Sequence, residues 1–91
     1  MSNQFEVFPT PKFDKDMEKL SEQDQKLVFE KIEIIKNNPF YQSRKVEGLV
    51  EDGEAIFRTR INRDIRLFWQ YKGNRIILML RVGHHDIWRE I

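Results

Sequence analysis

Three segments with alternating side chains, separated by two short turn-prone tripeptides, most constrain what this chain can fold into. The segments cover about residues 55–61, 64–71 and 75–82. Asn62-Arg63-Asp64 separates the first two, and Lys72-Gly73-Asn74 separates the next two. Connections of this length and composition join antiparallel strands as hairpins. The sequence therefore predicts a three-stranded antiparallel meander in the second half of the chain.

The beginning of the chain carries the signals of a short strand followed by a helix. Residues 4–8 are rich in aromatic and β-branched side chains and are stopped by Pro9, which predicts a strand. Thr10-Pro11 then predicts a helix start, because the Thr hydroxyl caps a helix and Pro suits its first turn. An apolar stripe at helical spacing follows, made of Phe13, Met17 and Leu20.

A second helix is predicted directly after the first. Ser21-x-x-Asp24 is close to a capping box and restarts a helix. Asn37-Asn38-Pro39 ends it, since the residue before Pro resists helical geometry. Such a short connection predicts two antiparallel helices. Residues 39–54 show no period and contain two glycines, so we expect them to form a connector. The tail after Gly83 has room for only one or two helical turns.

Length and composition limit the class of protein. Ninety-one residues with 40% hydrophobic side chains predict one domain over residues 1–91 with a modest core. The chain has no cysteine, which excludes disulfides and thiolate sites from it. The longest apolar run, Ile76–Leu80, is far shorter than a membrane span, and no signal peptide is recognisable. We expect a cytoplasmic α+β protein that does not contact a membrane.

The charges are unevenly divided along the sequence. Residues 1–43 hold six Lys against eight acidic residues, whereas residues 44–91 hold ten basic residues against seven acidic ones. All eight arginines lie in the second part, and residues 55–82 contain Asp64 as their single acidic residue. Arginine binds phosphate groups through a rigid fork of donors, which favours nucleic acid as a ligand. The alternative is that Arg simply tolerates a half-buried sheet better than Lys does.

Alternation assigns the side chains of the meander to two faces. The predicted core face has three rows: Phe57, Thr59 and Ile61; Ile65, Leu67, Trp69 and Tyr71; and Ile76, Leu78, Leu80 and Val82. If the helices cover these rows, four arginines emerge together on the opposite face. These are Arg58, Arg60, Arg66 and Arg81, with Phe68 and Met79 between them as platforms for stacked bases.

The sequence Val82-Gly83-His84-His85-Asp86 ends the last strand. Histidine is the natural general acid or base near neutral pH, and one of two adjacent histidines should face the arginines. Three consecutive ligands do not easily converge on one ion, so we expect no metal and no cofactor. The alternatives are that Asp86 caps a helical turn and that His84 makes a local hydrogen bond. Trp69 is expected in the core.

The order of strand, two antiparallel helices and three-stranded meander resembles the RelE/ParE superfamily of bacterial toxins. The residues that carry the resemblance are Ile56–Arg60, Asp64–Trp69 and Leu80–His85. The resemblance implies a toxin of a type II toxin–antitoxin system, bound by a cognate antitoxin. For RelE-like members it implies cleavage of mRNA on the ribosome, in which a 2′-hydroxyl attacks the adjacent phosphate without a metal.

The resemblance also implies roles for individual residues. Arg66 matches the arginine that stabilises the phosphate, His85 the basic or His position after the family's Gly, and Arg81 a position that is frequently basic; these are the predicted catalytic residues. The predicted RNA-binding residues are Arg58, Arg60, Phe68, His84 and Trp88. Two alternatives stay open: a ParE-like protein that inhibits DNA gyrase by binding it, and an RNA-binding relative without catalytic activity.

Overall fold

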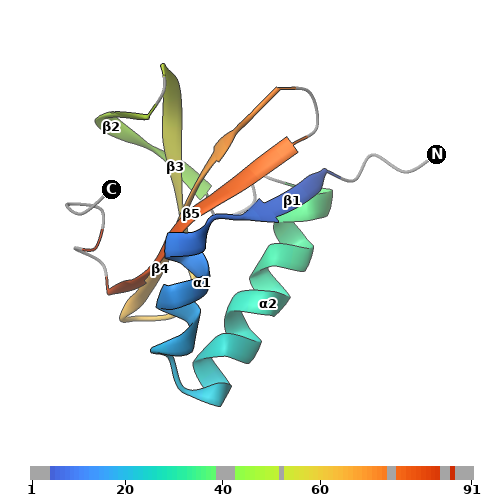
Figure 1. Ribbon diagram of the computed structural model, residues 1–91, viewed down its shortest axis with the longest axis vertical. Coiled ribbons are helices and arrows are strands. Elements are labelled where there is room, and N and C mark those ends of the chain that lie inside the picture. The colour runs from blue at the N-terminus through green and yellow to red at the C-terminus, as the bar shows by residue number, and fades with distance from the viewer. Residues whose placement is uncertain (1–4, 39–42, 52, 74–75, 85–86, 88–91) are drawn as a thin grey trace.

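A computed structural model describes residues 5–38, 43–51, 53–73, 76–84 and 87. Along this part of the chain a strand precedes two helices and four further strands (Figure 1). In chain order the elements are β1 (Glu6–Pro9), α1 (Pro11–Glu18), α2 (Glu22–Asn37), β2 (Ser43–Glu51), β3 (Glu54–Arg60), β4 (Ile65–Tyr71) and β5 (Ile76–His84). The predicted α+β fold class is confirmed.

The five strands form one sheet in the order β1-β5-β4-β3-β2. Strands β3, β4 and β5 pair antiparallel, so the predicted meander is confirmed. The first strand, β1, runs parallel to β5 and pairs with its first half, from Glu6 opposite Ile76 to Pro9 opposite Met79. The end of the chain therefore contributes an inner strand of the sheet, between β1 and β4.

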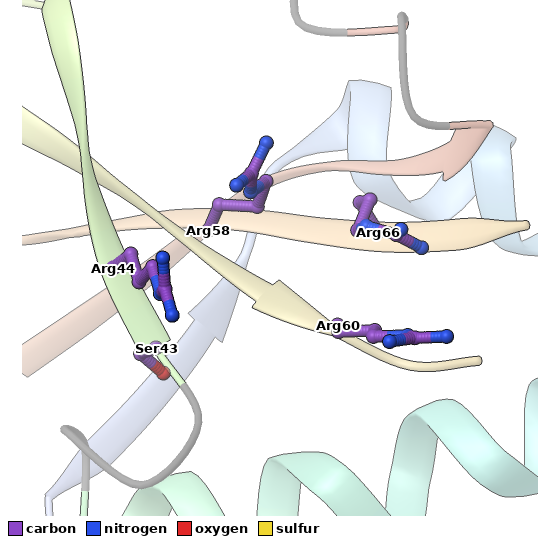
Figure 2. Close-up of a pocket in the computed structure, with 5 residues that line it drawn as sticks. All are labelled: Ser43, Arg44, Arg58, Arg60 and Arg66. Carbon is purple, nitrogen blue, oxygen red and sulfur yellow. The ribbon is translucent and has the colours of Figure 1, made fainter. Parts of the chain in front are cut away.

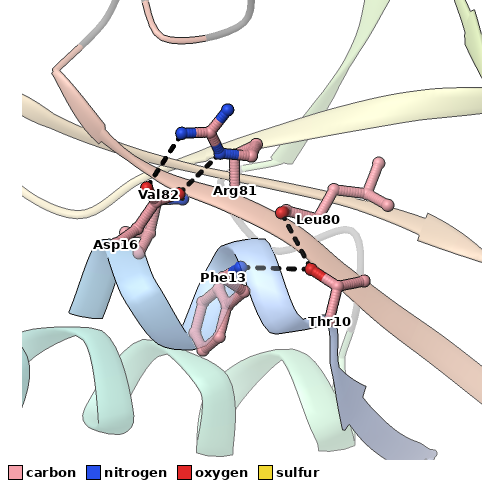
Figure 3. Close-up of polar contacts among 6 residues, drawn as sticks. All are labelled: Thr10, Phe13, Asp16, Leu80, Arg81 and Val82. Carbon is pink, nitrogen blue, oxygen red and sulfur yellow. Dashed lines mark hydrogen bonds and ion pairs between the residues drawn. The ribbon is translucent and has the colours of Figure 1, made fainter. Parts of the chain in front are cut away.

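Side-chain caps start both helices where the sequence predicts them. The Thr10 hydroxyl accepts a hydrogen bond from the Phe13 amide at 3.1 Å and donates to the Leu80 carbonyl at 3.1 Å (Figure 3). The Ser21 hydroxyl accepts from the Asp24 amide at 3.1 Å. Each cap satisfies an amide that has no partner inside its helix. Thr10 additionally ties the start of α1 to β5.

Strand β2 corrects the prediction that residues 39–54 are only a connector. Residues 43–51 pair antiparallel with β3, but the register shifts between Lys45 and Val50. Gly48 lies within this shift with a φ of +74°, in the left-handed region that glycine adopts readily. The irregularity removes the alternation by which a strand is recognised in a sequence, and for this reason the prediction was wrong.

The helices cover one face of the sheet, α1 against β5 and α2 against β1 (Figure 1). The buried side chains of this face include Phe13, Met17, Val28, Ile35, Leu67, Trp69, Ile77 and Met79. Trp69 is fully buried, as expected, and its indole N–H donates to the Thr59 hydroxyl at 2.9 Å. The part of the chain that the structure describes contains no helix long and apolar enough to span a membrane.

A second, smaller apolar cluster lies on the other face of the sheet. It consists of Ile56, Phe68 and Leu80, with Val46, Leu78 and Ile87 packed against it. The predicted face assignment of the last strand is therefore wrong for Leu78 and Leu80. Strand β5 is apolar on both faces, so alternation alone could not choose between them. A β-bulge follows, because Phe68 pairs with Arg81 whereas the next residue, Trp69, pairs with Met79. This shift of the register by one residue places Val82 on the helix side of the sheet, as predicted.

Candidate phosphate-binding site

Four arginines from three neighbouring strands surround a hollow of about 370 Å³. Arg44 comes from β2, Arg58 and Arg60 from β3, and Arg66 from β4, and Ser43 completes the lining (Figure 2). The strand register explains the grouping, because Arg44 lies opposite Arg58 and Arg60 lies opposite Arg66. Paired residues share a face of the sheet, as do residues two apart on one strand.

The β3–β4 turn fixes the guanidinium of Arg66. Its Nη1 donates to the carbonyls of Asn62 at 2.7 Å, Arg63 at 3.1 Å and Ile65 at 3.2 Å. The Asn62 side chain holds the turn itself, since its Oδ1 accepts from the amides of Asp64 and Ile65, both at 2.9 Å. Arg66 thus keeps one orientation, in which Nε and Nη2 make no hydrogen bond to any described residue.

The charged side chains that line the hollow are all arginines. Burial lowers the pKa of Arg66, Arg60 and Arg58 lower it further, and Asp64 opposes them. An arginine remains charged near neutral pH despite such a shift, because its ordinary pKa is so high. No carboxylate of the described residues forms an ion pair with any of the four guanidinium groups. The hollow therefore presents several positive charges that no carboxylate of the described ranges neutralises, and an anion could do so.

Arg58→Ala is expected to raise the melting temperature at low ionic strength. The side chain of Arg58 is exposed, lies opposite Arg44 and repels Arg66, and like charges placed directly opposite one another destabilise a sheet. The gain should be visible at low ionic strength and vanish in 1 M salt, where charges are screened within about 3 Å. Thermal melts beside Arg63→Ala, an exposed turn residue outside the hollow, provide the comparison. A melting temperature lowered by several degrees would contradict this interpretation of the charge cluster.

Arg81 lies outside this hollow, which corrects its predicted place among the exposed arginines. Its Nε and Nη2 donate to the two carboxylate oxygens of Asp16 on α1, at 2.7 and 2.9 Å (Figure 3). The same carboxylate accepts from the Val82 amide at 3.1 Å. Asp16 is 3% exposed and Arg81 9%. A buried guanidinium requires such a partner, so the geometry gives Arg81 a structural place and we propose no catalytic role for it.

Solved structures of bacterial and archaeal toxins share this mixed α+β fold, although the arrangement of the strands differs in detail. The RelBE2 toxin–antitoxin complex of Mycobacterium tuberculosis matches with a TM-score of 0.72 and 20% identity, over 90% of this chain and 99% of that one. The archaeal RelE–RelB complex of Pyrococcus horikoshii matches with a TM-score of 0.73 and 17% identity, over 91% and 97%. This chain has the RelE-like toxin fold. The predicted resemblance is confirmed at the level of the fold.

Other comparisons agree with the RelE-like fold or find no relative. The YoeB dimer of Staphylococcus aureus matches with a TM-score of 0.71 and 16% identity, over 90% of this chain and 98% of that one. No protein-family profile matches the sequence, and no curated protein sequence matches it. The resemblance to RelE-like proteins is therefore carried by the structure and by the short motifs in the sequence.

The remaining predicted site residues differ in where they lie on this RelE-like fold: some are buried, one is exposed, and two lie outside the described residues. Phe68 is fully buried in the second apolar cluster and Met79 among the helix-side residues, so neither is an exposed platform for bases as predicted. His84 is exposed at the end of β5. His85 and Trp88 lie outside the described residues. Their predicted roles, and that of His84, stay predictions.

Ile87 shows where the chain returns after β5. A Cβ atom at Gly83 would lie 2.7 Å from the Ile87 side chain. Gly83 is directly opposite Arg66 in the sheet, and Ile87 packs with the second apolar cluster. Ile87, two positions after the second histidine, is thus anchored on the arginine face, beside Arg66. Glycine at position 83 permits this close packing, which any larger side chain would disturb.

Arg44 is the lining arginine that sequence reasoning missed. It belongs to β2, which the sequence does not reveal as a strand, so no face could be assigned to it. The available signal was the charge distribution, since Arg44 is the first of eight arginines that all lie at position 44 or later. That signal marks Arg44 as part of the basic half but does not place it beside Arg58.

Proposed function

We propose that this chain, as a single toxin domain over residues 1–91, is the toxin of a type II toxin–antitoxin system and cleaves ribosome-bound mRNA. The observation that carries the proposal is the hollow of Arg44, Arg58, Arg60 and Arg66, whose guanidinium groups have no carboxylate partner among the described residues. Arginine forks match phosphate oxygens, and unpaired cations on one face attract a polyanion. The RelE-like fold also supports a toxin role for this chain.

The reaction proposed is transesterification without a metal. A ribose 2′-oxygen bonds to the adjacent phosphorus, the bond from phosphorus to the 5′-oxygen of the next nucleotide breaks, and a cyclic phosphate remains. The 2′-hydroxyl loses a proton and the leaving oxygen gains one. Negative charge grows on the phosphate oxygens in the transition state, and fixed donors stabilise it most. Arg66, held by the turn carbonyls, is the proposed donor.

His85 is the residue proposed to move a proton, and the pH dependence of cleavage tests that role. An imidazole changes its charge near neutral pH, so a rate that depends on it bends in that range. We expect wild-type cleavage to show such a bend and His85→Asn to remove it while the domain still melts cooperatively. His84→Asn is the matched control. A bend that persists in His85→Asn and disappears in His84→Asn would transfer the role to His84.

The proposed protein partner is a cognate antitoxin. Two structures similar to this chain are RelE–RelB or RelBE2 toxin–antitoxin complexes. A cluster of unpaired positive charges invites an acidic or amphipathic segment, which would cover the arginine face or displace the tail that follows β5. Co-expression with the product of a neighbouring small gene should yield a complex at micromolar concentration.

Induction of the chain in bacterial cells tests the proposed function directly. The expected result is growth arrest with cleavage of mRNA within translated regions, and the purified protein should cut mRNA on programmed ribosomes. Accumulation of broken DNA without mRNA cleavage would instead identify a gyrase inhibitor of the ParE kind. RNA binding without cleavage or growth arrest would identify an inactive relative.

A further inference from the structure

We propose that the arginine hollow consists of two phosphate subsites that hold consecutive phosphates of one RNA strand running along β3. The first subsite is formed by Arg60 and Arg66, and the second by Arg44 and Arg58. The inference depends on the proposed function only in assigning the cleaved phosphate to the first subsite. It gives Arg44, on β2, a role in binding the neighbouring nucleotide.

The strand register divides the four arginines into these pairs. Arg60 lies directly opposite Arg66, and Arg44 directly opposite Arg58. Directly opposite residues have Cβ atoms about 4.5–5.5 Å apart, so two long side chains can reach one phosphate between them. Figure 2 shows Arg60 and Arg66 together toward the end of β3 and the start of β4, with Arg44 and Arg58 further back along β2 and β3.

The separation of the two pairs fits a nucleic acid backbone. Arg58 and Arg60 are two residues apart on β3, which corresponds to about 6.8 Å at roughly 3.4 Å per residue. This is comparable with the distance between successive phosphates in an extended single strand. Positively charged grooves that follow the backbone are the usual way in which proteins hold single-stranded nucleic acid.

The surroundings of the two subsites differ, which indicates which one holds the cleaved phosphate. Three carbonyls of the β3–β4 turn accept hydrogen bonds from Arg66. Gly83 lies directly opposite Arg66 in the sheet, and the Ile87 side chain packs against Gly83. The two histidines of the tail lie between these positions in the sequence. Arg44 and Arg58 are exposed and lie toward β2, away from the end of β5. Among the arginines that lower the pKa of Arg66, Arg60 acts more strongly than Arg58, in agreement with this grouping.

Short RNA analogues test the two subsites without the ribosome. The ligands are 2′-O-methyl dinucleotides, which cannot be cleaved, with one internal phosphate alone or with an added phosphate at the 5′ or the 3′ end. Their affinities are measured by competition against a fluorescent 2′-O-methyl hexanucleotide. We expect one of the two terminal phosphates to raise the affinity of the wild type about tenfold, because a charged fork binds phosphate strongly.

Arg44→Ala should remove this tenfold gain and leave the affinity for the dinucleotide with one phosphate within about twofold. Arg66→Ala should lower the affinity for all the dinucleotides but preserve the gain from the terminal phosphate. Arg63→Ala should change neither the affinities nor the gain. For the hexanucleotide, Arg44→Ala should reduce the slope of log affinity against log salt by about 0.7, the value for one lost phosphate contact on a single strand.

Three results would overturn the two-subsite inference: a wild type that binds none of the oligonucleotides, no gain from either terminal phosphate, or a gain that survives in Arg44→Ala. Cleavage on programmed ribosomes is measured separately. If the wild type cleaves mRNA but Arg44→Ala keeps the gain, only the subsite assignment fails. If the gain depends on Arg44 but the wild type does not cleave mRNA, the two subsites stand and the proposed ribonuclease function fails.

Discussion

Arg66→Ala is expected to lower the rate of mRNA cleavage on programmed ribosomes about 10²–10³-fold, the usual cost of losing one donor that stabilises transition-state charge. Arg66 is the arginine of the hollow whose orientation is fixed by three backbone carbonyls, at 2.7, 3.1 and 3.2 Å. Its Nε and Nη2 make no hydrogen bond to any described residue, so they remain available to a phosphate. The chemical step should slow more than binding weakens, because a fixed donor acts most strongly on the growing charge.

Arg63→Ala and Arg66→Lys are the matched comparisons. Arg63 is an exposed residue of the same turn, and its carbonyl, which accepts from Arg66, survives the substitution. Arg63→Ala should therefore cleave at the wild-type rate. Arg66→Lys keeps the charge but loses the planar fork, and should fall between wild type and Arg66→Ala. The assignment of Arg66 fails if Arg66→Ala, shown to be folded by a thermal melt, cleaves within about threefold of wild type.

Asp16→Ala is expected to destabilise the fold by about 3–5 kcal/mol, the range for removing one partner of a buried ion pair. The carboxylate of Asp16 is 3% exposed. It accepts three hydrogen bonds: two from Arg81, at 2.7 and 2.9 Å, and one from the Val82 amide, at 3.1 Å. Without it, the buried Arg81 guanidinium loses the carboxylate that accepts two of its hydrogen bonds. Urea unfolding measures the loss as a lower midpoint with an unchanged slope.

Asp14→Ala is the control for this prediction. Asp14 is an exposed acidic residue in the first turn of the same helix, so its loss should cost no more than about 1 kcal/mol. A second variant separates the ion pair from the packing of α1. Asp16→Leu combined with Arg81→Met replaces the pair by apolar side chains and should recover most of the lost stability. A double variant as unstable as Asp16→Ala would show that the charge of Arg81 is not the cause.

Sequence reasoning succeeded where the signal is local. Thr10 and Ser21 cap the two helices within three residues of themselves, and they do so in the structure as expected. The turn at Asn62 separates two strands whose alternation is regular, so Arg58, Arg60 and Arg66 were correctly placed on one face. These predictions needed no knowledge of any distant part of the chain.

The predictions failed where the outcome depends on a distant partner or an irregularity. Arg81 was expected beside the other arginines, but its partner Asp16 lies 65 positions earlier in the sequence. Phe68 was expected to be exposed because Trp69 fills the helix-side core, yet the chain builds a second apolar cluster around it. Strand β2 was missed because its register shift removes the alternation. The sequence alone therefore supplied three of the four arginines of the hollow.

The pairing of β1 with β5 has a consequence for the order in which the molecule folds. The first strand needs residues 76–79 as its partner, and the cap of α1 at Thr10 bonds to Leu80, 70 positions later. Contacts between such distant parts of a chain form slowly, because a long loop must close first. While the chain is being synthesised, β1 and α1 must wait for β5 to leave the ribosome. A chain that ends before residues 76–80 therefore lacks the finished sheet. We expect such incomplete chains to be cut by proteases more readily than the complete chain.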